Sequence, residues 1–132
     1  MNISLLSAGI LSALAGLIHP VAGEYLIVRH LDGSHLRPTP FGDGDITRRI
    51  LRGAWHFITL DFLLSAVILL ALAFSCVPAG AREMSRFISL HFFGYALIIW
   101  IVAGHRFVHV LIHVPQWILL SAIAALAWWG GR

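Results

Sequence analysis

The chemistry that this chain could perform rests on histidines and carboxylates that stand inside apolar segments. Ionisable side chains within a bilayer carry an insertion cost, so they are rare there and tend to mark ion paths, ligand sites or cofactors. Mixed imidazole and carboxylate donors suit zinc, iron or manganese. We therefore predict a transition-metal site near one face of a membrane, built from six side chains: His19, Glu24, His56, Asp61, His109 and His113.

The two late histidines of this set have the spacing of a chelating pair. His109 and His113 are four residues apart, which is close to one helical turn, so both imidazoles can reach the same point. His105 lies four residues earlier and would extend the same face, although it falls at a predicted turn.

The early histidines are each followed, five residues later, by a carboxylate: His19 by Glu24 and His56 by Asp61. Five residues correspond to about 140° around a helix, so one span cannot aim both groups at one ligand without distortion. Pro20 could supply that distortion in the first span. Antiparallel spans would bring Glu24 near the level of His56 and Asp61 near that of His19, which predicts crossed histidine–carboxylate pairs.

A b-type haem is the first alternative to a metal ion. Two histidines from different spans, such as His56 and His109, would be its axial ligands, and His91 would bind in a second arrangement. Arg52 or Arg106 would then pair with the propionates. Haem ligation alone does not explain the nearby carboxylates.

Two further alternatives remain open. Histidine titrates near neutrality and can relay protons, so the chain could be a proton- or ion-coupled carrier that works as a homo-oligomer. It could equally be a structural subunit of a larger membrane complex. Several enzyme motifs are absent, among them GxSxG, a phosphate-binding glycine loop and HExxH, and no polar basic surface for nucleic acid is predicted.

The composition indicates a single integral membrane domain. Of the 132 residues, 59% are hydrophobic and 11% are charged, whereas a soluble domain carries about 25% charged residues. The mean hydropathy is +0.87. We therefore predict an all-α, four-transmembrane-helix antiparallel bundle whose apolar surface faces the lipid bilayer, with a homodimer or a larger membrane complex as its possible assembly.

The predicted spans cover residues 3–28, 54–74, 87–103 and 107–129. A long polar loop, residues 29–53, joins the first two, and within it residues 45–52 are predicted to form a short amphipathic helix capped by Asp45. The third and fourth spans are expected to be separated by a turn at residues 104–106, because a turn at Pro115 would leave too few residues to cross.

The arginines predict the orientation. The side with the polar loop and the 104–106 turn carries six of them: Arg29, Arg37, Arg48, Arg49, Arg52 and Arg106. The other side carries three: Arg82, Arg86 and Arg132. Because cytoplasmic segments are enriched in basic residues, we expect a bacterial-type inner membrane protein with its long loop in the cytoplasm and both termini outside.

Overall fold

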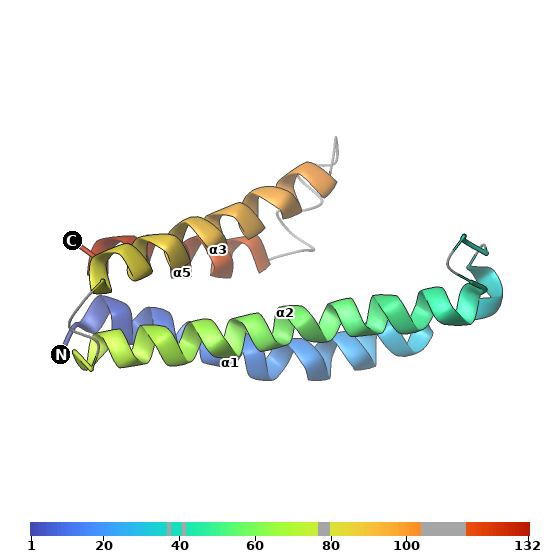
Figure 1. Ribbon diagram of the computed structural model, residues 1–132, viewed down its shortest axis with the longest axis horizontal. Helices are drawn as coiled ribbons and strands as arrows, with labels where there is room; N and C mark the ends of the chain where they lie inside the picture. The colour runs from blue at the N-terminus through green and yellow to red at the C-terminus, as the bar shows by residue number, and fades with distance from the viewer. Residues whose placement is uncertain (37, 41, 77–79, 104–115) are drawn as a thin grey trace. The chain divides into compact units, whose positions relative to one another are not determined.

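The computed structural model describes residues 1–36, 38–40, 42–76, 80–103 and 116–132 (Figure 1). Its α-helices are α1 (Ile3–Leu26), α2 (Gly44–Ala73), α3 (Ala81–Ala103) and α5 (Gln116–Gly130). Two short 3-10 helices, η1 (Val28–His30) and η2 (Gly33–His35), follow α1. No β-strand occurs among these residues, which confirms the prediction of an all-α protein.

Three segments of the described chain are long and apolar enough to cross a membrane: Ile3–His30, Gly44–Ala73 and Ala81–Val102. The helix α5 is also apolar but has only 15 residues, about 22 Å at the usual rise, against a hydrocarbon core of about 30 Å. It covers the later part of the predicted span 107–129. The predicted turn at 104–106 and the start of that span lie outside the described residues.

The helix α2 begins at Gly44, so the amphipathic helix predicted at residues 45–52 and the apolar segment predicted from residue 54 form one continuous helix. The backbone N–H of Ile46 donates to Oδ1 of Asp43 at 3.0 Å, so Asp43, and not Asp45, caps the helix. Nothing interrupts the helix between the amphipathic turns and the apolar ones, since a single interior glycine costs only about 1 kcal/mol. Helix therefore replaces much of the long loop predicted at residues 29–53.

The shorter connection between α1 and α2 is held by local hydrogen bonds. The Asp32 carboxylate accepts from the backbone N–H of Ser34 at 2.9 Å at the start of η2. Thr39 and Gly42 exchange backbone hydrogen bonds of 2.8 and 3.0 Å. Gly33 and Gly44 approach so closely that a Cβ on Gly44 would meet the Gly33 carbonyl oxygen.

The chain divides into two compact units: unit 1 comprises Met1–Ser12 and Ser65–Arg132, and unit 2 comprises Ala13–Leu64. In unit 1, α3 packs on α5 (Figure 1). The Ser85 hydroxyl donates to the Ala127 carbonyl at 2.5 Å, and the Ser89 hydroxyl donates to the Ala124 carbonyl at 2.7 Å. Small hydroxyl-bearing residues thus bring the two backbones together, as is common between membrane helices.

Asn2 ties three helix ends of unit 1 together. Its backbone N–H donates to the Ala73 carbonyl at 2.9 Å, at the end of α2. Its side-chain amide donates to the Gly130 carbonyl at 2.9 Å, at the end of α5, and its side-chain oxygen accepts from the backbone N–H of Leu5 at 3.2 Å. The start of α1 and the ends of α2 and α5 therefore meet at one place.

Glycines at seven-residue intervals let α1 lie close to α2. In unit 1, a Cβ on Gly9 would lie 2.8 Å from Leu70, and in unit 2 a Cβ on Gly16 would lie 2.7 Å from Leu63. Gly23 continues the series and faces Trp55. Because residues seven apart share one face of a helix, these glycines form one smooth stripe, the α1 glycine stripe, against which side chains of α2 pack.

Candidate functional site

In unit 2, the half-buried indole of Trp55 lies against the backbone of α1 at Gly23. A Cβ on Gly23 would collide with this ring. The indole also stacks on the imidazole of His19, with centroids 4.4 Å apart and planes inclined by 11°. Its Nε1–H donates to the His19 carbonyl at 3.2 Å. Gly23 and the Trp55 indole together fix the position of His19 and the orientation of its ring.

Hydrogen bonds connect the His19 ring to Thr59 and, through it, to Trp55. The Thr59 hydroxyl lies 3.5 Å from the Trp55 carbonyl, to which it donates. Nδ1 of His19 lies 3.0 Å from the same hydroxyl, and the tautomer of the ring decides which of the two atoms donates. In the tautomer with the proton on Nδ1, the lone pair of Nε2 is left to accept a metal ion or another proton.

Glu24 lies about one turn beyond His19 on α1 and pairs with Arg52 of α2. The guanidinium Nη2 is 2.8 Å from Oε1 of the carboxylate. The second oxygen, Oε2, is buried and has no hydrogen-bond partner among the described residues. A buried carboxylate oxygen without a partner is costly, so this atom is suited to binding an additional cation or proton.

The two predicted site residues on α2, His56 and Asp61, lie close to the levels of the two on α1. Counting from the Gly16–Leu63 and Gly23–Trp55 contacts, Glu24 lies within one turn of the level of His56, and His19 within one turn of Asp61. His56 is exposed. Asp61 is half-buried.

The crossed pairing of Glu24 with His56 and of Asp61 with His19 stays a prediction. The partners that hydrogen bonds and ion pairs give to His19 and Glu24 are Thr59 and Arg52. Within the described part of the chain, no three histidine, cysteine or acidic side chains already form a group that could hold a metal ion. The remaining predicted ligands, His109 and His113, and also His105 and Arg106, lie outside it.

His91, the residue reserved for the haem alternative, belongs to unit 1 and is surrounded by aromatic rings of α3. Its imidazole lies 4.4 Å from the Tyr95 ring, 6.1 Å from Phe87 and 6.0 Å from Phe92, measured between centroids. Phe87, His91 and Tyr95 are spaced four apart, so they line one face of the helix. These contacts favour packing as the role of His91.

Sequence reasoning missed the neighbours that orient His19, namely Trp55 and Thr59. Neither residue belongs to the set of ligands predicted from the sequence. The signal that could have found them is the glycine stripe: Gly9 and Gly16 predict Gly23 as its third member. A helix paired antiparallel along that stripe brings residues near position 55 to Gly23.

Comparison with known proteins gives no match: no protein-family model, no curated protein and no solved structure shows significant similarity to this chain.

Proposed function

We propose that this chain is a small integral membrane protein that binds a transition metal ion between α1 and α2, with His19, His56 and Glu24 as its first ligands and Asp61 beside them. A redox or a transport role would follow from such an ion. The observation that carries the proposal is the hydrogen bond of 3.0 Å between Nδ1 of His19 and the Thr59 hydroxyl, because the tautomer in which Nδ1 donates leaves Nε2 free to bind the ion.

Metal-binding imidazoles usually donate their other ring N–H to an oxygen, because that hydrogen bond fixes the tautomer and orients the lone pair. Thr59 supplies this oxygen. The unpartnered Oε2 of Glu24 supports the proposal independently, since a cation would satisfy it. Binding would require His56 to swing inward, which its exposed position permits.

Metal analysis of the protein purified in detergent tests the proposal. We expect one zinc, iron or manganese ion per chain, and at least tenfold weaker retention in His19→Ala and Glu24→Gln. His91→Ala is the matched control and should retain the ion. Equal metal content in all four proteins would contradict the proposal, and a strong Soret band would favour haem instead.

A second candidate function is proton transfer along the same helix pair. It is favoured by the arrangement of the ionisable groups, which are distributed along α1 and α2 rather than gathered into one chelating group. In that case proteoliposomes without added metal should dissipate an imposed pH gradient, and His19→Ala should abolish the flux. Flux that survives this substitution would exclude His19 as a relay.

A further inference from the structure

We propose that unit 1 carries a binding site for one anionic phospholipid, at the end where α3 begins and α5 ends. The site combines a groove for an acyl chain with a cluster of arginines for the phosphate. It lies in a different unit from the proposed metal site and does not depend on it.

The groove runs between α3 and α5 and has a volume of about 350 Å³. Its wall is largely apolar and includes Leu90 and Phe93 from α3 and Ala125 from α5. Leu90 and Phe93 are 61% and 58% exposed, so this wall is open to an occupant rather than filled by the protein's own side chains. An apolar groove on a membrane-spanning helix pair fits a hydrocarbon chain.

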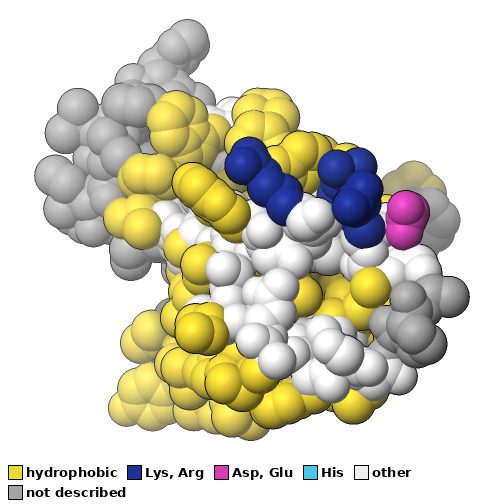
Figure 2. All heavy atoms as spheres, turned by 90° about the vertical axis from the view of Figure 1, so that its left-hand side faces the viewer, with side chains coloured by type: hydrophobic (Ala, Val, Ile, Leu, Met, Phe, Trp, Pro, Cys, Tyr) yellow, Lys and Arg dark blue, Asp and Glu magenta, His cyan; other side chains and the backbone are white. Residues whose placement is uncertain are grey.

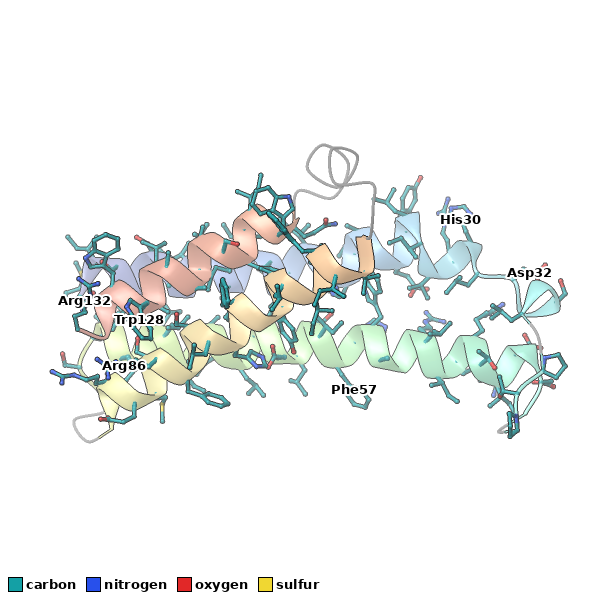
Figure 3. All side chains as sticks on the ribbon, turned by 90° about the horizontal axis from the view of Figure 1, so that it is seen from above. His30, Asp32, Phe57, Arg86, Trp128 and Arg132 are labelled. Atoms are coloured by element: carbon teal, nitrogen blue, oxygen red, sulfur yellow. The ribbon has the colours of Figure 1, made fainter. Side chains whose placement is uncertain are left out.

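Arginines stand at one end of the groove. Arg132 is part of its lining, and the guanidinium of Arg82 donates to the backbone oxygen of Arg132 at 3.2 Å. Arg86 lies one turn after Arg82 on α3, so both project from the same face. Figure 3 shows Arg86 and Arg132 at the same end of α3 and α5, and Figure 2 shows arginine atoms on this face beside hydrophobic surface, with acidic atoms next to some of them.

Among the described residues, no side-chain carboxylate forms an ion pair with these three arginines, although Glu83 is their neighbour in the sequence. Arg82 and Arg86 also occupy the first turns of α3, where the helix dipole is positive and acidic residues are preferred. Among the described residues, the contacts given for these arginines are the Arg132 backbone oxygen and two tryptophan rings, and no side-chain carboxylate is paired with them. A phosphodiester is the complementary group.

The tryptophans place this end of the groove at the membrane surface. The Arg86 guanidinium lies 5.4 Å above the Trp128 ring, and that of Arg132 lies 5.3 Å above the Trp129 ring. Both tryptophans line the groove and are exposed. Tryptophan is enriched at the level of lipid headgroups, so the arginines stand where the phosphate of a lipid would be and the groove extends toward its acyl chain.

Thermal stability in detergent with added lipid tests the proposal. Phosphatidylglycerol should raise the melting temperature more than phosphatidylcholine at equal concentration. Each arginine near an anionic headgroup contributes roughly fivefold in affinity, so R82Q/R86Q should weaken binding of phosphatidylglycerol about 25-fold. The matched control R48Q/R49Q removes two exposed arginines of unit 2 and should bind as the original protein does.

Several outcomes would overturn the proposal. These are an equal response to both lipids, an unchanged response in R82Q/R86Q, or reproduction of the whole effect by inorganic phosphate. A second measurement uses the unsubstituted protein: brominated phosphatidylglycerol should quench its tryptophan fluorescence more strongly than brominated phosphatidylcholine at the same mole fraction. Equal quenching would also contradict a specific anionic site.

Discussion

The Thr59 hydroxyl lies 3.0 Å from Nδ1 of His19 and accepts its hydrogen in the tautomer that the proposed metal site requires. Thr59→Val keeps the shape of the side chain but removes this acceptor. We expect metal affinity to fall about 10- to 100-fold, because an imidazole without its orienting hydrogen bond no longer presents Nε2 in a fixed direction. Metal competition with a chelator of known affinity would measure the change.

Thr59→Ser is the control for this substitution, since it retains the hydroxyl and loses only a methyl group. It should bind the ion with nearly the original affinity. If the valine and serine variants bind alike, the hydroxyl does not position His19.

The sequence alone identifies the ionisable groups that stand in apolar segments, and their role as ligands stays a prediction: His19, Glu24, His56 and Asp61. Their immediate partners were harder to predict. Thr59 and Trp55 are ordinary residues in membrane helices, and only the register between α1 and α2 distinguishes them from their neighbours. The sequence supplies that register through the glycine stripe, which becomes informative only when Gly23 is counted with Gly9 and Gly16.

At the scale of helices, substitutions of glycine by alanine can distinguish the effect of close helix packing on stability from the effect of helix propensity. Gly23→Ala places a methyl group against the Trp55 indole, so we expect it to lower the free energy of unfolding by about 1–3 kcal/mol. A titration with denaturing detergent in mixed micelles, followed by circular dichroism, would measure the change.

Gly53→Ala offers the opposite expectation in α2. A Cβ at Gly53 would meet nothing within 4 Å, so only the intrinsic preference of alanine for helix acts there, and stability should rise by about 0.5–1 kcal/mol. If both variants lose the same free energy of unfolding, the close approach of Trp55 to Gly23 does not explain the loss.

The extent of α2 shows why helix boundaries were less predictable than helix identity. Hydropathy identified the apolar part of this helix but said nothing of the polar turns that precede it. The start at Gly44 depends on a capping hydrogen bond to Asp43. Several aspartates in this segment could cap a helix, and the local pattern alone favoured Asp45.

For the molecule as a whole, the hydrogen bonds of Asn2 bear on the number of membrane crossings. They bring the start of α1 to the ends of α2 and α5. Chain ends that meet in this way are on the same side of a membrane, which requires an even number of crossings and supports four spans over three. The short α5 then needs additional residues, snorkelling side chains or local thinning of the bilayer to complete its crossing.

Cys76 permits a direct test of this topology, because it is the only cysteine of the chain and it is exposed just after α2 ends. It should lie on the side of the termini, and the arginine distribution predicts that this side is outside. A membrane-impermeant maleimide should therefore label it in intact spheroplasts. In a Cys76→Ser background, Ser34→Cys places the thiol in the connection between α1 and α2, and labelling should then require inverted vesicles. If both positions are labelled from the same side, the number of crossings between them is not odd, which contradicts the predicted topology. If Cys76 is labelled only in inverted vesicles and Ser34→Cys only in spheroplasts, the bundle is as predicted but its orientation in the membrane is the opposite one.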